Sequence, residues 1–188
     1  MASNNDKNPR LFLAAPVDQA LAEALHQSLM ASLDALPPLN PVAIENLHLT
    51  LTFIGACPAE KLRSTLLPAL QPVLAEARPG RVHLRQVAGF PRADQARCLV
   101  AEGTPSETLR QWQQQLQEAV QSQLGNSEGQ DGLWRPHITL ARFRQTPETP
   151  VAATPWLQDL PVSEVILYQS ETTPKGPVYQ PLERWSLS

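Results

Sequence analysis

Arg135-Pro136-His137-Ile138-Thr139-Leu140-Ala141-Arg142 carries a histidine and a threonine two positions apart in a run that alternates like a β-strand. Successive strand side chains point to opposite faces, so we expect His137 and Thr139 on one face and Ile138 and Leu140 on the other. A second copy, Asn46-Leu47-His48-Leu49-Thr50-Leu51-Thr52-Phe53, lies 89 positions upstream in a chain of 188 residues. Repetition at nearly half the chain length favours two similar lobes, each contributing one His-x-Thr strand.

The rest of the chain shows further strand and helix patterns. We expect strands over 10–16, 44–55, 80–91, 97–102, 133–144, 162–170 and 178–187. We expect helices over 18–36, 58–77 and 105–124, the first capped by Asp18 and the third by Ser106 or Thr104. The glycine-rich run 125–132 and the proline-rich run 145–155 are predicted to be irregular connections. This mixture, with hairpin-like neighbours, favours an α+β fold over a parallel doubly wound sheet.

Composition narrows the classes of partner. The formal net charge is -3 and charged residues make up 18%, which argues against a broad surface for long duplex nucleic acid, although a few local arginines suffice for a small or terminal phosphate. The first ten residues are polar, and no apolar run approaches the roughly 18 residues of a membrane span, so we expect a cytoplasmic protein with no membrane association. Cys57 and Cys98 are isolated and are predicted to stay reduced.

Two histidines in equivalent positions of two lobes can face each other across a cleft. Imidazole titrates near pKa ~6.5, so one ring can act as a base while the other, protonated, acts as an acid. This pairing suits phosphodiester cleavage, with Thr50 and Thr139 donating to phosphate oxygens and an arginine holding the developing charge. Two other interpretations remain: His48 and His137 as ligands of zinc or copper, and both rings merely hydrogen-bonded within the sheet.

Other charged and aromatic residues receive plainer interpretations. His83 lies between Arg81 and Arg85 on a strand face and is taken as a surface histidine, and Arg135 and Arg144 are taken as surface charges. Strand alternation places Phe53 with Leu49 and Leu51, which favours core packing for its ring, although an aromatic side chain here can also stack on a base.

Four stretches resemble one known family. They are Arg10-Leu11-Phe12, Glu45-Asn46-Leu47-His48-Leu49-Thr50-Leu51 with Phe53-Ile54-Gly55, the stretch quoted first, and Gly176-Pro177-Val178-Tyr179-Gln180-Pro181-Leu182-Glu183-Arg184-Trp185. Together they resemble the RNA 2′,3′-cyclic phosphodiesterases, also called bacterial 2′-5′ RNA ligases, of the two-histidine (2H) phosphoesterase superfamily. The chain departs from many relatives at Leu13, where they carry a second aromatic residue.

The resemblance implies one bilobed domain over 1–188, with two pseudo-symmetric lobes of antiparallel sheet, helices on the outside and a central cleft. It also implies hydrolysis of an RNA-terminal 2′,3′-cyclic phosphate to a 2′-phosphomonoester, without metal or other cofactor. By this resemblance His48 is the acid and His137 the base, although the roles are exchangeable. Thr50, Thr139 and Arg142 match phosphate contacts, and Phe12 or Phe53 is a base-stacking residue.

The implied partners are RNA ends or nucleotides bearing a 2′,3′-cyclic phosphate, with no protein partner and a monomeric state. Reversible 2′-5′ RNA ligation is an alternative activity of such a family. A non-catalytic module that binds phosphorylated RNA ends is the alternative from another class of function, and a cyclic phosphate on a different metabolite is an alternative substrate.

Overall fold

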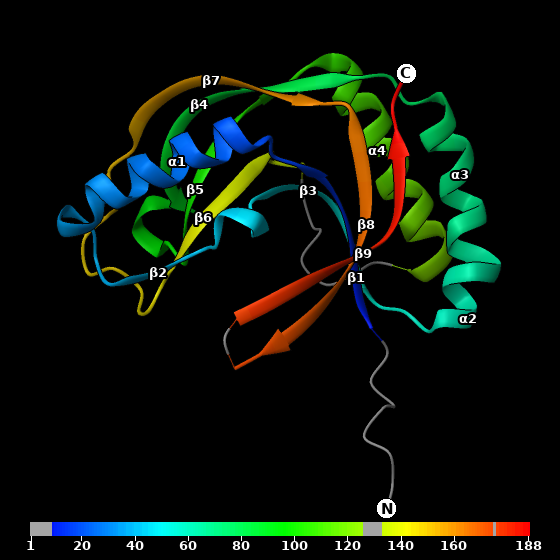
Figure 1. The fold of residues 1–188 in the computed structure, drawn as a ribbon, viewed down its shortest axis with the longest axis horizontal. Helices are drawn as coiled ribbons and strands as arrows, with labels where there is room; N and C mark the ends of the chain where they lie inside the picture. Colours follow the sequence, from blue (N-terminus) through cyan, green and yellow to red (C-terminus); the bar gives the residue numbers. More distant parts are fainter. Residues whose placement is uncertain (1–8, 126–132, 175) are drawn as a thin grey trace, which may run out of the picture.

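The computed structural model describes residues 9–125, 133–174 and 176–188. The polar amino-terminal run 1–8 and most of the predicted connection 125–132 lie outside these described residues. Figure 1 shows a strongly curled sheet with helices packed along it, which agrees with the predicted α+β class. No helix within the described ranges is long and apolar enough to cross a membrane.

The described residues form nine strands. They are β1 Arg10–Pro16, β2 Leu39–Pro41, β3 His48–Ala56, β4 Gly80–Phe90, β5 Cys98–Pro105, β6 His137–Phe143, β7 Thr154–Val162, β8 Glu164–Thr173 and β9 Gly176–Ser186. The helices are α1 Gln19–Ser32, α4 Glu107–Leu124 and a continuous run made of α2 Ala59–Lys61, the π-helical η3 Leu62–Leu66 and α3 Leu67–Glu76. Short 3₁₀ turns are η1 Leu33–Ala35, η2 Ile44–Asn46 and η4 Ala93–Gln95.

The sheet is antiparallel and has two matching halves. Its strand order is β7-β4-β5-β6-β3-β1-β8-β9, and the short strand β2 also pairs with β6. The two His-x-Thr strands, β3 and β6, are central neighbours and pair through Leu49 and Ile138. We call β3, β1, β8 and β9 the β3 lobe, and β6, β5, β4 and β7 the β6 lobe. The predicted pair of similar lobes is therefore present, joined edge to edge in one sheet.

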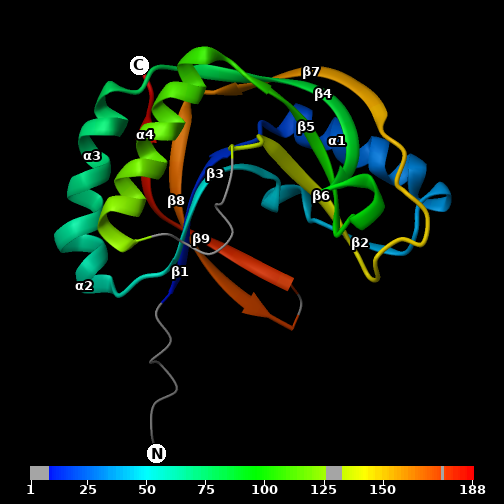
Figure 2. The ribbon, with the colours of Figure 1, turned by 180° about the vertical axis from the view of Figure 1, so that it is seen from behind.

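Each lobe is covered by a helix that the other lobe supplies. Helix α1 follows β1 of the β3 lobe but packs on β6, and α4 follows β5 of the β6 lobe but packs on β3 (Figures 1 and 2). The predicted caps are confirmed: Asp18 Oδ1 accepts from the Leu21 amide at 3.0 Å, and Ser106 Oγ accepts from the Leu109 amide at 3.4 Å. The helices bury one continuous apolar core on one face of the sheet, which leaves the opposite, inner face for the two motifs.

Proline explains two differences from the predicted elements. The sequence patterns predict no strand over 154–161, yet these residues belong to β7, whose Pro155 and Pro161 pair with Gln86 and Arg81 of β4. Strand β7 lies at the edge of the sheet, where a missing N–H need not be paired, so proline is tolerated there. The helix predicted over 58–77 runs from Ala59 to Glu76, but with a π turn just before Pro68, which relieves the backbone conflict that proline creates.

The motif strands also begin later than predicted. Residues 44–46 form a 3₁₀ turn and β3 starts at His48, while β6 starts at His137 rather than at 133. Each catalytic candidate is therefore the first residue of its strand, at the point where the chain turns into the sheet.

Candidate active site

The two histidines are held in the same way at the same strand position. His48 Nδ1 lies 2.7 Å from the Asn46 carbonyl oxygen, and His137 Nδ1 lies 2.8 Å from the Arg135 carbonyl oxygen. A carbonyl oxygen only accepts hydrogen bonds, so Nδ1 must carry the proton in both rings. Both rings therefore keep Nε2 for chemistry, and in His48 this atom lies 3.1 Å from Thr50 Oγ1.

The antiparallel pairing brings the four motif residues together. Leu49 faces Ile138 across the β3–β6 junction, so His48 falls next to Thr139 and Thr50 next to His137. All four side chains are partly exposed and lie on the inner face, away from the helices. The predicted convergence of two imidazoles and two hydroxyls is therefore present in the structure.

Each motif strand contains an extra residue directly after its motif threonine, and β3 has a second one, Ile54, between Phe53↔Phe12 and Gly55↔Leu11. The pairing of β3 with β1 passes from Thr50↔Ala14 directly to Thr52↔Leu13, and the pairing of β6 with β5 passes from Thr139↔Val100 directly to Ala141↔Leu99. The extra residues after the threonines are Leu51 and Leu140. A β-bulge of this kind re-aims the side chains that follow it.

These equivalent bulges turn a different side chain inward in each lobe. Phe53 and Arg142, each five positions after the histidine, are both exposed on the inner face, and Phe53 is 54% exposed. The prediction that Phe53 packs in the core was wrong, because strict alternation does not continue through the bulge at Leu51. Thr52, expected on the polar face, is instead 3% exposed. The inner face thus receives an aromatic ring from β3 and a guanidinium from β6.

Two side chains from outside the sheet fix the bulged segment of β3. Gln113 of α4 is 2% exposed, and its Nε2 donates to the Leu51 carbonyl at 2.9 Å. Trp134 Nε1 donates to the Thr50 carbonyl at 3.1 Å. Both bonds cross long sequence distances and satisfy carbonyls next to the first motif. The glutamine-rich face of α4 carried no functional prediction, and only its buried member has this role.

Aromatic rings surround His48. The centroids of Phe12 and Tyr179 lie 5.0 and 5.2 Å from the His48 ring, with Tyr179 approaching edge-on, and Tyr168 stacks on Phe12 at 5.3 Å. Phe12 is only 5% exposed, whereas Phe53 extends from it at 6.4 Å toward solvent. A small hollow of about 40 Å³ opens beside His48 between Asn46, Tyr168 and Tyr179. Tyr179 lies in the carboxyl-terminal motif of the family resemblance, so a sequence signal for it existed.

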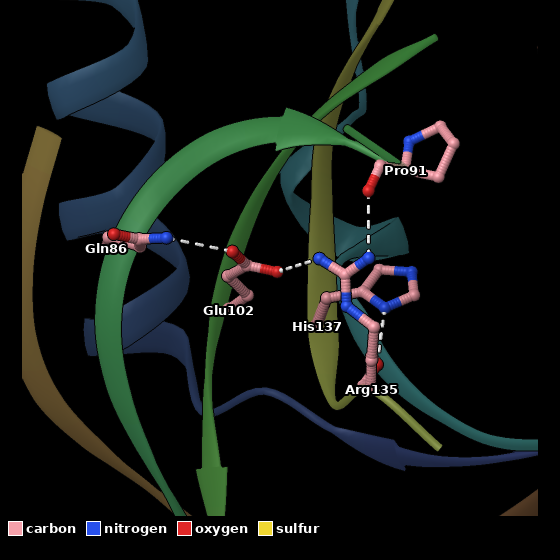
Figure 3. Close-up of polar contacts among 5 residues, drawn as sticks. All are labelled: Gln86, Pro91, Glu102, Arg135 and His137. Atoms are coloured by element: carbon pink, nitrogen blue, oxygen red, sulfur yellow. Dashed lines mark hydrogen bonds and ion pairs between the residues drawn. The ribbon is translucent and has the colours of Figure 1, made fainter. Parts of the chain in front are cut away.

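His137 is held by a different set of contacts. Phe90 stacks on its ring at 4.3 Å, and the Arg135 guanidinium covers Phe90 at 4.6 Å from the ring centroid. Arg135 also donates to Glu102 Oε2 at 2.9 Å and to the Pro91 carbonyl at 2.8 Å, and Gln86 Nε2 donates to Glu102 Oε1 at 2.9 Å (Figure 3). The predicted surface position of Arg135 is confirmed, since its side chain is half exposed, but the guanidinium also covers the aromatic ring that stacks on His137.

Arg142 contacts Cys98 and acts electrostatically on His48 and Tyr179. Its Nη1 is 3.5 Å from Cys98 Sγ, and its charge adds to the lowering of the His48 pKa by burial. Burial raises the pKa of Tyr179, and Arg142 offsets part of that rise. The register explains this neighbourhood, because Arg142 pairs with Cys98 as Phe53 pairs with Phe12. Arg144, by contrast, donates to Asn40 Oδ1 at 3.1 Å at the far end of β6, where no part of the two motifs lies.

Burial is the main influence on both imidazoles. It lowers the pKa of His48, with further lowering by the charges of His137 and Arg142 and partial compensation from the hydrogen bond to the Asn46 carbonyl. It also lowers the pKa of His137, where the Arg135 carbonyl and the Glu102 carboxylate raise the pKa and the Arg135 charge lowers it. Glu102 is thus the anionic partner of His137. Among the described residues, no group of three His, Cys, Asp or Glu side chains is placed to hold a metal ion.

Comparisons with known proteins agree with the family resemblance of the sequence. A family model described as the 2′-5′ RNA ligase superfamily matches residues 18–172. The chain is 35% identical over 181 residues to an RNA 2′,3′-cyclic phosphodiesterase of Thermus thermophilus, covering 94% of this chain and 87% of the relative.

Solved structures share the fold of this chain. The crystal structure of TT0787 of Thermus thermophilus matches with a TM-score of 0.78 and 32% identity, covering 95% of this chain and 97% of that one. The crystal structure of E. coli LigT complexed with 3′-AMP matches with a TM-score of 0.73 and 27% identity, covering 96% and 98%. Because the family model matches residues 18–172 and a relative is 35% identical over 94% of this chain, the chain belongs to the 2′-5′ RNA ligase superfamily.

Proposed function

We propose that this chain hydrolyses RNA-terminal 2′,3′-cyclic phosphate to a 2′-phosphomonoester, with His48 and His137 as the acid–base pair and without a metal. The observation that carries the proposal is the matched presentation of two Nε2 atoms, each on a ring whose Nδ1 donates to a carbonyl two residues upstream. The curated relative named RNA 2′,3′-cyclic phosphodiesterase and the E. coli LigT structure with 3′-AMP support the substrate class.

The proposed reaction has one displacement at phosphorus. Neutral His137 takes a proton from water at Nε2, and the water oxygen forms a bond to phosphorus. The bond from phosphorus to the ribose O3′ breaks, and protonated His48 gives its Nε2 proton to that oxygen. The products are a 2′-phosphomonoester and a 3′-hydroxyl, and exchange of one proton with solvent restores both rings. General acid–base catalysis of this kind typically contributes 10²–10⁴-fold in rate for each group.

Electrostatics support this direction of proton transfer. His137 gains positive charge when it accepts the water proton, and the carboxylate of Glu102 stabilises that charge. His48 loses positive charge when it donates, and burial together with Arg142 favours its neutral form. The resemblance suggested the same assignment but left the roles exchangeable, and the unequal neighbours of the two rings favour His48 as the acid.

Substrate contacts follow from the exposed side chains of the inner face. Thr50 and Thr139 are partly exposed beside the histidines and can donate to non-bridging phosphate oxygens, while Arg142 holds the phosphate charge. We propose Phe53 as the base platform, because it is 54% exposed, whereas Phe12 is 5% exposed and supports the His48 ring from below. All of these residues come from one chain, so a monomer contains the whole proposed site.

The proposal is tested with adenosine 2′,3′-cyclic phosphate and separation of the 2′- and 3′-phosphate products. We expect His48→Ala and His137→Ala each to lower kcat by at least about 10²-fold, while the matched control His26→Ala, on α1, leaves it unchanged. Treatment with a chelator should leave the wild-type rate unchanged. Full activity in both site variants would refute the proposal.

The rival function, a module that binds phosphorylated RNA ends without turnover, gives a different result in the same assay. Such a module binds the cyclic phosphate at all pH values from 5 to 8 and releases no phosphomonoester. A bell-shaped dependence of kcat/KM on pH requires one neutral and one protonated group, and it would exclude a module of this kind.

A further inference from the structure

A second, larger hollow in the described structure lies away from the histidines. It has a volume of about 480 Å³ and is lined by His83, Leu84, Arg85, Leu157, Gln158 and Asp159 of β4 and β7. It lies where β4 also departs from regular pairing. Against β5 the register passes from Leu84↔Gly103 to Gln86↔Glu102, so Arg85 is an extra residue of β4. Against β7 it passes from Leu84↔Gln158 to Gln86↔Pro155, so Arg85 alone faces two residues of β7, Trp156 and Leu157. The hollow is thus built into the sheet between β4 and its edge strand.

The sheet register connects this hollow to the candidate active site. His137 pairs with Glu102, and Glu102 pairs with Gln86, so these three residues form a row across β6, β5 and β4. His137 and Gln86 are therefore separated by two strand spacings, or about 10 Å. His83 lies beyond Gln86 on β4 and pairs with Thr104, which shares a face with Glu102. Since Val82 and Leu84 belong to the helix-covered core, His83 and Arg81 lie on the inner face with the two motifs.

The polar groups of the hollow are pre-arranged. Asp159 Oδ1 accepts from His83 Nδ1 at 2.6 Å, and Asp159 Oδ2 lies 3.6 Å from Arg81 Nη1. The His83 ring therefore has a fixed orientation and keeps Nε2 available, although its side chain is 46% exposed. Gly103 allows this geometry, because a Cβ there would overlap the carbonyl of His83. Leu157, 79% exposed, adds an apolar contact at the edge.

The charges of the two sheet edges differ in sign. The strands at this edge, β4 and β7, carry Arg81, Arg85 and a single acid, Asp159. The strands at the opposite edge, β8 and β9, carry Glu164, Glu171 and Glu183 with one arginine. A polyanion that enters the site is therefore attracted toward β4 and β7 and repelled from β8 and β9.

Resting on the proposed function, we propose that the hollow between β4 and β7 binds the phosphodiester backbone of the nucleotides that precede the cyclic end. Arg85 in the hollow and Arg81 beside it, next to Asp159, contact phosphates. His83 Nε2 contacts a phosphate or ribose oxygen, and Leu157 contacts a base or ribose. The inner face then distinguishes an RNA end from a cyclic mononucleotide, which fills only the space around the two histidines. The ligand class is single-stranded RNA bearing a terminal 2′,3′-cyclic phosphate.

The test compares adenosine 2′,3′-cyclic phosphate with a six-nucleotide RNA that ends in the same group. In the double variant Arg81→Ala/Arg85→Ala we expect KM for the RNA to rise about tenfold and KM for the mononucleotide to stay unchanged. The slope of log kcat/KM for the RNA against log salt becomes shallower by about 1.4, from two phosphate contacts at about 0.7 each. The matched control Arg63→Ala/Arg110→Ala removes the same charge from exposed helical positions and leaves both substrates unaffected.

A third variant should change KM for the RNA in the opposite direction. Asp159→Asn keeps an oxygen acceptor for His83 but removes the negative charge of the hollow, so KM for the RNA should fall while KM for the mononucleotide stays constant. An unchanged KM for the RNA in the arginine variant, or an equal rise for both substrates, would overturn the proposal.

Binding measurements separate this proposal from the proposed function. The anisotropy of a labelled six-nucleotide RNA with a 2′-phosphate end reports binding without turnover, with 2′-AMP as the competing short ligand. Absence of hydrolysis in the wild type counts against the proposed function alone. Loss of RNA affinity in Arg81→Ala/Arg85→Ala supports the hollow as a binding site, and unchanged RNA affinity overturns it.

Discussion

Gln113→Met offers a direct test of how the first motif is positioned. Methionine has a length similar to that of glutamine but no amide, so the substitution removes the donor to the Leu51 carbonyl and leaves the packing volume nearly unchanged. The glutamine is 2% exposed, and the carbonyl belongs to the extra residue of the bulge. A buried carbonyl that loses its partner costs about 1–3 kcal/mol.

The expected effects are a loss of stability and weaker binding of substrate. The free energy of unfolding should fall by about 1–3 kcal/mol in a urea titration, and Tm by about 2–12 °C for a chain of this size. KM for adenosine 2′,3′-cyclic phosphate should rise, because Thr50 and Phe53 flank the bulge that Gln113 fixes.

Gln114→Met is the matched control. Gln114 is the next residue of α4 but is exposed and bonds only within the helix, to Glu118 at 2.9 Å. Its substitution should change the free energy of unfolding by less than about 0.5 kcal/mol. If Gln113→Met is no more destabilising than Gln114→Met, the buried amide does not hold the bulge and the reasoning fails.

Three further predictions concern the site and the fold. Burial lowers the pKa of both His48 and His137 below 6.5. The maximum of kcat/KM lies between the two pKa values of the free enzyme, so it should fall below pH 6.5. A stopped-flow pH series with its maximum above pH 7 would contradict this prediction. Cys98, partly exposed beside Arg142, should react with iodoacetamide more slowly in saturating inorganic phosphate, whereas buried Cys57 should stay unmodified in both conditions, as peptide mass spectrometry can show. We propose that 1–188 is a single domain, because each lobe is covered by a helix from the other. Circular dichroism and tryptophan fluorescence should therefore report one coincident unfolding transition. Two separated transitions would argue for independent lobes.

Sequence patterns identified the two motifs and the fold class but not the faces of the motif strands. His48, Thr50, His137 and Thr139 lie on one face, as alternation predicts. Beyond them, alternation fails in both strands because an extra residue follows each motif threonine. No local propensity marks it: Leu51 is an ordinary strand residue in an ordinary strand sequence. Its bulge is fixed by Gln113, which lies 62 positions away.

The residues that support His137 were also beyond sequence reasoning. Phe90, Glu102 and Arg135 meet only through the register of β4, β5 and β6, and each is an ordinary residue in its own segment. Strand β7 was missed for a different reason, since its prolines argue against a strand except at an edge, and a strand's position in the sheet is a tertiary property. What the sequence patterns could not supply is therefore long-range pairing rather than chemistry.

The two equivalent bulges bear on the regioselectivity of the proposed reaction. In a perfectly two-fold site, either histidine could face either ester oxygen of the cyclic phosphate, and hydrolysis would yield the 2′- and 3′-phosphate isomers in equal amounts. The bulge at Leu51 presents Phe53, whereas the bulge at Leu140 presents Arg142. In the roles proposed for these residues, we expect the nucleoside and the phosphate charge to be drawn to different lobes. A difference of about 2.7 kcal/mol between the two orientations is enough for a hundredfold excess of one isomer. We therefore expect two insertions at the same position, followed by unlike side chains, to select which ribose oxygen leaves phosphorus.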